Sequence, residues 1–120
     1  MNEGDVVLTP MPQADGQVKH RPCIALRRLP GFGDWLVCGV STQLHQEVPG
    51  FDDRVLPDHE DYAGTGLKAP SLIRLGFLAV LPEGRLLGTI GSVSPARHRW
   101  LLRRLSSYLV EGSGATTSQS

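Results

Sequence analysis

Short apolar runs alternate with clusters of proline, glycine and charged residues along most of the chain. Runs of this length, bounded by turn-forming residues, are typical of β-strands. They predict strands at residues 5–9, 21–26, 35–41, 54–56, 71–75, 77–81 and 85–91. Residues 35–41 are almost wholly apolar, which favours a central strand, and Gly76 is expected to bend one strand within residues 71–81.

Helical periodicity is confined to the C-terminal part of the chain. Leu101, Leu105 and either Tyr108 or Leu109 recur at helical spacing, and the arginines of this segment fall mostly elsewhere on the helical wheel. Ser94 can cap this helix, with Pro95 as its first residue, because proline at that position loses no hydrogen bond. Residues 112–120 are small and polar and are predicted to be disordered.

The order of these elements describes one small, mainly β domain. Several short strands, a long acidic excursion over residues 43–66 and one C-terminal α-helix predict a strongly curved barrel in residues 1–111. A length of 120 residues leaves no room for a second domain. Glycine (14) and proline (9) together form about a fifth of the chain, which suits strands and turns better than a helical bundle.

Composition excludes several classes of protein. The 12 basic and 12 acidic residues give a net charge of zero, which argues against a uniformly basic nucleic-acid coat protein. No apolar run approaches the ~18 residues of a membrane span, and no secretory signal is visible at the start. We therefore expect a soluble, cytoplasmic domain that does not bind a membrane.

Charge is segregated along the sequence although it sums to zero. Half of the acidic residues lie in residues 47–61, and five of the twelve basic residues lie in residues 85–104, which hold no acid. A second basic group comprises Lys19, Arg21, Arg27 and Arg28. Each basic group is either a solvated surface or part of a positive groove, because only the local field acts on a phosphate within a Debye length of ~8–10 Å.

The cysteines and one acidic tract offer little independent chemistry. Cys23 and Cys38 lie on neighbouring predicted strands and could face each other, but in a reducing cytosol we expect buried thiols rather than a disulfide. Residues 58–61 (Asp-His-Glu-Asp) have the residue types of metal ligands, yet no second cluster accompanies them. We expect no metal site and no cofactor.

An ordered series of motifs is more specific than any of these features. In chain order, the motifs are Gly4-Asp5 before an apolar strand, Lys19-His20-Arg21-Pro22, Ser41-Thr42-Gln43 at a strand end, Leu67 to Arg74 with Ser71 between, and Ile90-Gly91-Ser92-Val93-Ser94 before the helix. Over roughly residues 4–110 this series resembles the MazF/PemK (Kid) family of toxins from bacterial type II toxin–antitoxin systems.

The resemblance implies a fold and an activity. The fold is an SH3-like barrel (MazF/CcdB-like) with a C-terminal helix, assembled as a homodimer. The activity is a metal-independent endoribonuclease that inhibits growth by cleaving single-stranded RNA, including mRNA, at short sequences through attack of a ribose 2′-OH. A cognate antitoxin neutralises such a toxin, and operator DNA bound together with the antitoxin is a further partner that the resemblance raises.

The resemblance also points to four catalytic residues. Arg21 matches the family's Arg-Pro arginine, whose forked guanidinium can stabilise charge on a phosphorane. Ser41 matches a hydroxyl residue at the end of the third strand, and Arg74 matches a second arginine found in some members. Those members have an acid two residues later, a candidate general base, where this chain has Gly76. His20 is then either the substitute base, because imidazole titrates near neutral pH, or a surface loop residue.

RNA binding and its alternatives complete the expectations. Lys19, Thr42, Gln43 and Phe32 are the expected RNA contacts, Phe32 by stacking on a base. The missing acid supports one alternative, a non-catalytic relative that binds an antitoxin-like partner or nucleic acid. The other alternative is an unrelated SH3-like adaptor module, which would bind no RNA even at low salt.

Overall fold

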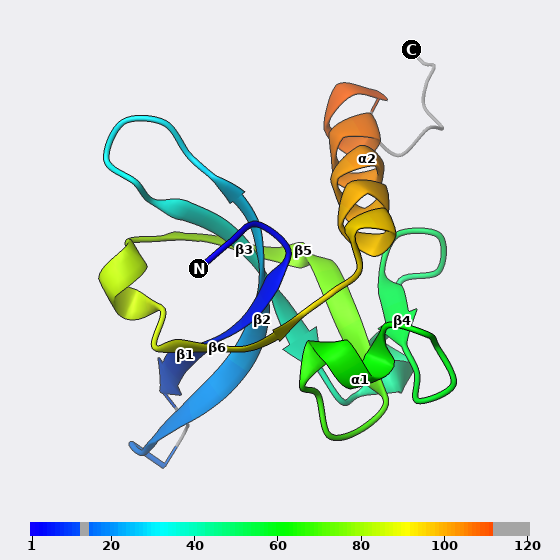
Figure 1. Cartoon of the computed structure of the whole chain (residues 1–120), viewed down its shortest axis with the longest axis horizontal. Helices are drawn as coiled ribbons and strands as arrows, with labels where there is room; N and C mark the ends of the chain where they lie inside the picture. Colours follow the sequence, from blue (N-terminus) through cyan, green and yellow to red (C-terminus); the bar gives the residue numbers. More distant parts are fainter. Residues whose placement is uncertain (13–14, 112–120) are drawn as a thin grey trace.

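The computed structural model describes residues 1–12 and 15–111 and contains the predicted strands and C-terminal helix (Figure 1). In chain order the elements are β1 (Asp5–Pro12), β2 (Val18–Arg28), β3 (Trp35–Ser41), η1 (Leu44–Gln46), β4 (Asp53–Val55), α1 (Tyr62–Thr65), β5 (Ser71–Leu81), η2 (Glu83–Arg85), β6 (Gly88–Ser92) and α2 (Pro95–Glu111). The predicted disordered tail, residues 112–120, lies outside the described residues.

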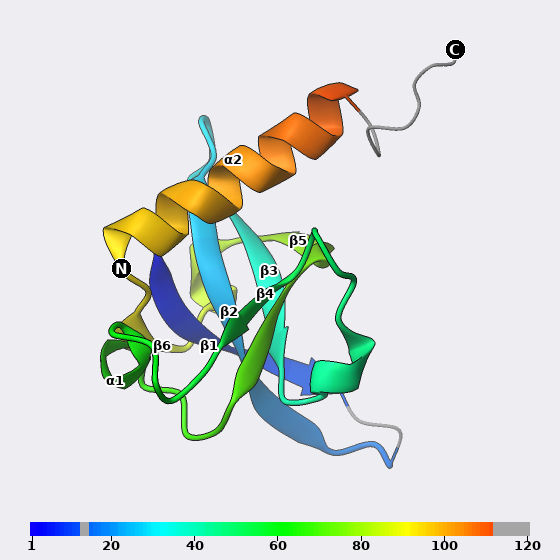
Figure 2. The ribbon, with the colours of Figure 1, turned by 90° about the vertical axis from the view of Figure 1, so that its right-hand side faces the viewer.

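Six antiparallel strands form one curled sheet in the order β4-β5-β3-β2-β1-β6. The apolar strand β3 lies inside the sheet, as predicted. Helix α2 lies diagonally across one face of this half-barrel, and the segment from β5 through η2 to β6 closes the other (Figures 1 and 2). The mainly β architecture with one C-terminal helix is therefore confirmed.

The sheet carries a separate apolar core on each face. The core beneath α2 contains Ile24, Cys38 and Ile73 from the strands and Leu101 and Leu105 from the helix. The smaller core on the opposite face consists of Val7, Cys23, Ala25, Trp35 and Val37, packed against Leu81 and Leu86. The expectation that the cysteines could face each other is wrong. Cys38 pairs with Ile24, the neighbour of Cys23, so alternation turns the two thiols to opposite faces.

The β1–β2 hairpin is longer than the sequence pattern predicts. β1 continues to Pro12 and β2 begins at Val18, whereas the strands were predicted only at residues 5–9 and 21–26. Pairing with β6 ends at Leu8, so the rest of β1 has a partner on one side only. Prolines are tolerated on such an open edge because no ladder hydrogen bond is lost there.

Strand β5 bends at Gly76, as predicted, through an irregularity in its pairing with β3. Arg74 pairs with Gly39, but the next pair joins Leu78 to Cys38, so residues 75–77 have no partner on β3. An insertion of this kind bends a strand and redirects its side chains. A second difference follows β5. The strand predicted for residues 85–91 is split into η2 and the shorter β6.

Helix α2 begins where the sequence pattern places its start. The Ser94 hydroxyl accepts a hydrogen bond from the Arg97 N–H at 3.1 Å, which satisfies one of the unpaired donors of the first turn. Within residues 1–12 and 15–111, no helix is long and apolar enough to cross a membrane.

Candidate functional site

Two of the expected catalytic residues flank a fork between β2 and β3. The two strands stop pairing at Cys23 and Gly39, beyond which β2 continues with β1 and β3 continues with β5 (Figure 1). Arg21 and Ser41 each lie two residues beyond that last pair. Because side chains alternate along a strand, both project from the face that carries Cys23. We call Arg21, Cys23, Gly39 and Ser41 the fork.

Arg74 joins this face from the neighbouring strand. It pairs with Gly39 on the side opposite to Cys23, so one row runs across three strands from Cys23 through Gly39 to Arg74. Paired residues of an antiparallel ladder project from the same face. The Arg74 Nη1 lies 3.4 Å from the Gln46 Oε1 of η1. The sheet register therefore brings Arg21, Ser41 and Arg74 to one face, although they are far apart in the sequence.

The hydroxyl of Ser41 also shapes the chain that leaves the fork. It accepts a hydrogen bond from the backbone N–H of Gln43 at 3.0 Å, which forms a tight turn before η1. The side chains of Thr42 and Gln43 are exposed next to this turn. Thr42 and Gln43, two of the four expected RNA contacts, thus directly follow Ser41 of the fork.

The remaining expected site residues divide between the fork and other places. Lys19 is exposed two residues before Arg21 and shares its face. His20 is exposed between them, and alternation directs its side chain to the other face of β2. Phe32 is 97% exposed, but it lies in the turn after β2, at the opposite end of that strand from Arg21. The structure does not bring Phe32 or the His20 side chain to the face of Arg21.

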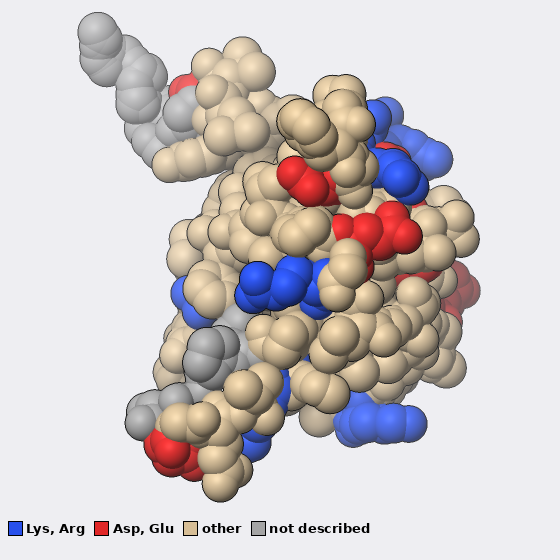
Figure 3. Space-filling model, turned by 90° about the vertical axis from the view of Figure 1, so that its left-hand side faces the viewer, with Lys and Arg blue, Asp and Glu red and all other residues tan. Residues whose placement is uncertain are grey.

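The second basic group (Lys19, Arg21, Arg27 and Arg28) also divides between the fork and the far end of β2. Arg27 pairs with Glu3 at 3.1 Å, and Arg28 lies 3.7 Å from Glu83. Among the described residues, no ion pair involves Lys19 or Arg21. Seen from the side of η2, Lys and Arg form separate groups with Asp and Glu between them, and uncharged surface covers most of this side (Figure 3). Attraction for phosphate would therefore be local rather than spread over the molecule.

Two of the five arginines in residues 85–104, Arg97 and Arg104, make contacts within the chain. Arg97 is only 13% exposed and pairs with Asp61 at 2.8 Å and with Asp53 at 2.6 Å. Hydrogen bonds from the Arg97 guanidinium hold the pKa of Asp61 well below its usual range. Arg104 stacks on the Trp100 ring at 3.7 Å. Both interpretations left open for this group, solvated surface or phosphate groove, are thus wrong for Arg97, because two carboxylates of the acidic excursion neutralise it.

The same contacts account for the acidic tract at residues 58–61. Asp61 binds Arg97, and the His59 Nδ1 accepts a hydrogen bond from the Leu56 N–H at 3.1 Å. No group of three potential metal ligands occurs in residues 1–12 and 15–111. The tract ties the excursion to the first turn of α2.

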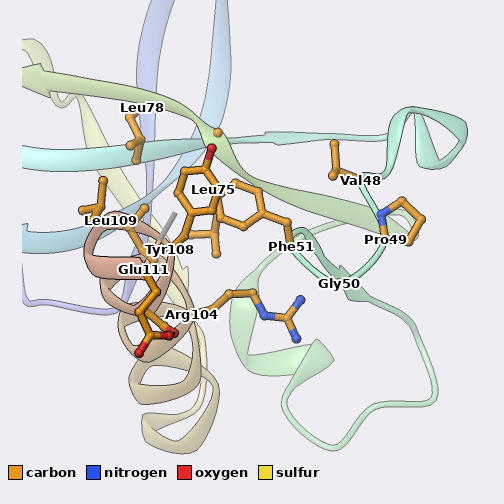
Figure 4. Close-up of a pocket in the computed structure, with 13 residues that line it drawn as sticks. Val48, Pro49, Gly50, Phe51, Leu75, Leu78, Arg104, Tyr108, Leu109 and Glu111 are labelled. Carbon is orange, nitrogen blue, oxygen red and sulfur yellow. The ribbon is translucent and has the colours of Figure 1, made fainter. Parts of the chain in front are cut away.

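A groove lies on the α2 side of the sheet, away from the fork. It measures about 920 Å³ and is lined by the loop at residues 48–51, by Leu75 and Leu78 of β5, and by the C-terminal half of α2 (Figure 4). Phe51 and Tyr108 meet in it with ring centroids 5.1 Å apart. None of the expected RNA or catalytic residues lines this groove.

Sequence reasoning missed Phe77, which lies on the same face as Arg74. In an uninterrupted strand, alternation would turn Phe77 and Leu75 toward the same face, beneath α2. The unpaired residues 75–77 reverse this, so Phe77 lies against Gly39. The Gly76 bend was readable from the sequence, but its effect on the next side chain depends on the register with β3.

Comparison with known proteins agrees with this architecture. Residues 2–109 match the model of the PemK-like, MazF-like toxins of type II toxin–antitoxin systems. No curated protein sequence matches the chain significantly.

Three solved structures are similar in fold. The Mycobacterium tuberculosis toxin MazF-mt6 has a TM-score of 0.63 and 19% identity, over 88% of this chain and 96% of that one. The MazE-MazF structure from Deinococcus radiodurans has a TM-score of 0.65 and 19% identity, over 97% of both chains. An endoribonuclease in complex with its cognate antitoxin, from a mycobacterial species, has a TM-score of 0.62 and 13% identity, over 97% of both chains. With the family match over nearly its whole length, the chain belongs to the PemK/MazF family of toxins from type II toxin–antitoxin systems.

Proposed function

We propose that this toxin is a metal-independent endoribonuclease that cleaves single-stranded RNA at the fork. The observation that carries the proposal is the sheet register, which brings Arg21, Ser41 and Arg74 to one face. Two guanidinium groups and a hydroxyl are donors suited to a phosphodiester, and none of them requires a metal ion.

The reaction is an internal transesterification. The ribose 2′ oxygen forms a bond to phosphorus, the P–O5′ bond breaks, the 2′-OH proton passes to a base, and O5′ takes up a proton. The products are a 2′,3′-cyclic phosphate and a 5′-hydroxyl. Arg21 donates to the non-bridging oxygens, where negative charge accumulates in the transition state, and is unsuited to act as the base because a guanidinium group in water holds its proton.

Ser41 and Arg74 hold the phosphate from the other side of the fork. The Ser41 hydroxyl accepts from Gln43 and still has its own proton to donate to a phosphate oxygen. Arg74 supplies a second positive charge. The sequence suggests His20 as the base, but its side chain projects from the other face of β2, so we assign the role of base to a water molecule bound at the fork.

The proposed partners follow from the family. One of the similar structures is a MazE-MazF structure, and another is an endoribonuclease in complex with its cognate antitoxin. We infer that this chain acts as a homodimer, cleaves mRNA in the cytoplasm and is neutralised by a cognate antitoxin that covers the fork. Co-expression of a cognate antitoxin should restore growth and abolish cleavage by the purified complex.

The test is cleavage of a mixed-sequence RNA in EDTA, with mapping of the product ends. Arg21→Ala should lower the rate by at least about a thousandfold without changing the circular dichroism spectrum. Arg27→Ala is the matched control, since Arg27 is an exposed arginine of the same strand at its other end. Equal rates for the wild type and Arg21→Ala would remove Arg21 from the mechanism.

One observation favours a second function. Gly76 stands where some relatives have an acid, and a chain without a base can still bind RNA or an antitoxin-like partner. Saturable binding of RNA with no product over hours would establish this non-catalytic function instead.

A further inference from the structure

We propose that Phe77 is the base-stacking platform of the RNA site. The inference rests on the proposed function, because it assigns a binding role beside the same fork. An aromatic ring beside a phosphate site holds single-stranded RNA by stacking on an unpaired base, without needing a particular sequence.

The ring of Phe77 lies at the apex of the fork. A Cβ atom added to Gly39 would be only 2.4 Å from the Phe77 Cδ2, so the ring rests directly on the backbone of Gly39. Gly39 is the last residue of β3 that pairs with β2, and Arg21 and Ser41 follow two residues beyond on the same face. A base on this ring would therefore belong to a nucleotide adjoining the phosphate held at the fork.

Charge beside the ring suits a nucleotide. The Arg74 Cζ lies 5.6 Å from the ring centroid, within the range of a cation–π contact. Stacking on Phe77 and phosphate contact by Arg74 would thus act on the same nucleotide. The pair resembles the combination of aromatic and basic groups that binds single strands in general.

Position and exposure together separate Phe77 from the other aromatic residues, because the exposed Trp100 and Tyr108 lie on α2, which covers the other face of the sheet (Figure 2). Phe77 is 51% exposed even though it lies on a sheet. All seven aromatic residues of the chain lie in its described part, and Trp35, which shares this face, is buried in the small core. Phe32 is more exposed, but it lies at the far end of β2. Phe77 is the exposed aromatic residue next to the fork.

The test measures binding of a fluorescein-labelled, mixed-sequence 2′-O-methyl RNA, which cannot react because its 2′ oxygen is blocked. Phe77→Leu keeps the apolar volume and removes the aromatic face, so the dissociation constant should rise about tenfold. Phe77→Trp should bind like the wild type, and saturating RNA should quench the emission of its added tryptophan. Phe32→Leu is the matched control and should leave affinity unchanged.

A second variant tests the contact between the Phe77 ring and Gly39 without removing the ring. Gly39→Ala should push the ring aside and weaken RNA binding as Phe77→Leu does. In a Phe77→Leu background, the same alanine should cost no further affinity, since coupled residues are non-additive. Thermal unfolding of each variant distinguishes lost binding from lost folding.

The outcomes separate this inference from the proposed function. Wild-type affinity in Phe77→Leu, or unquenched emission in Phe77→Trp, overturns the platform while cleavage by the wild type preserves the nuclease. If the wild type neither binds nor cuts RNA, both fail. If Phe77→Leu loses affinity only together with a fall in sedimentation mass, Phe77 belongs to a protein interface and the inference is overturned.

Discussion

Arg97 and Asp61 form an ion pair with two parallel contacts, the Arg97 Nε 2.8 Å from Oδ2 and the Arg97 Nη2 2.9 Å from Oδ1. The same Oδ2 accepts a hydrogen bond from the Ser94 N–H at 3.0 Å. One carboxylate therefore fixes both a helix arginine and the backbone at the start of α2. Ion pairs of this kind are strong because two N–H groups of the planar guanidinium point in parallel at the two carboxylate oxygens.

We expect Asp61→Asn to lower the free energy of unfolding at pH 7 by about 1–3 kcal/mol, since it leaves a largely buried Arg97 short of a partner. The pKa of Asp61 is lowered on folding, so its stabilisation is present above the ordinary carboxyl pKa of about 4 and is lost as the pH falls further. In urea unfolding, the difference in free energy of unfolding between Asp61→Asn and the wild type should therefore become smaller below pH 4. Glu47→Gln, which removes the exposed pair with Arg54, should change stability by less than about 0.5 kcal/mol.

Substitutions at Ser41 separate its structural role from its catalytic role. Ser41→Ala should lower the cleavage rate about tenfold to a hundredfold and the free energy of unfolding by about 1 kcal/mol, because the bond to Gln43 is lost as well. Ser41→Thr keeps the hydroxyl and should retain most of the cleavage rate and most of the free energy of unfolding. A threonine variant that is as inactive as the alanine variant would show that the hydroxyl is not what matters.

His20 is tested by the pH dependence of cleavage. Because its side chain projects from the face of β2 opposite to Arg21, we expect His20→Gln to keep the cleavage rate within about threefold and to leave the pH profile unchanged. A fall of a hundredfold, together with loss of an ionisation near pH 6–7, would identify His20 as the general base.

Gly66 is expected to tolerate no side chain. It has a φ of +74° at the end of α1, and an added Cβ would lie 2.1 Å from the carbonyl oxygen of Ile90. Gly66→Ala should lower the free energy of unfolding by about 2 kcal/mol or more, from backbone strain and displacement of β6. Gly84→Ala, where an added Cβ meets nothing within 4 Å, should change it by less than about 0.5 kcal/mol. Similar losses for both variants in urea unfolding would refute the steric explanation.

Local signals in the sequence were sufficient for most elements and for part of the site. The apolar run at residues 35–41, the bend at Gly76 and the Ser94 cap each depend on neighbouring residues, and all are present. The elements follow from propensity and alternation. The resemblance to the toxin family singled out Arg21 and Ser41 as candidate residues, and the register places both on one face.

Long-range geometry accounts for what the sequence pattern missed. Arg97 fits a solvated helix face until Asp61, 36 residues earlier, is known to lie beside it. The side of β5 from which Phe77 projects depends on three residues skipped in the pairing with β3. Neither contact has a periodic signature, so neither could be predicted from one sequence.

Because the two thiols lie on opposite faces of the sheet, the reactivity of each one reports on the opening of a different core. Burial raises the pKa of Cys23 to about 11 and raises that of Cys38 still further above its ordinary value, so neither thiol is ionised in the native chain near neutral pH. A buried thiol can be alkylated only after local opening of the structure exposes it to solvent. Each cysteine lies in a different core. The alkylation rate of Cys23 would therefore measure how often the small core opens, and the rate at Cys38 would measure how often α2 detaches from the sheet.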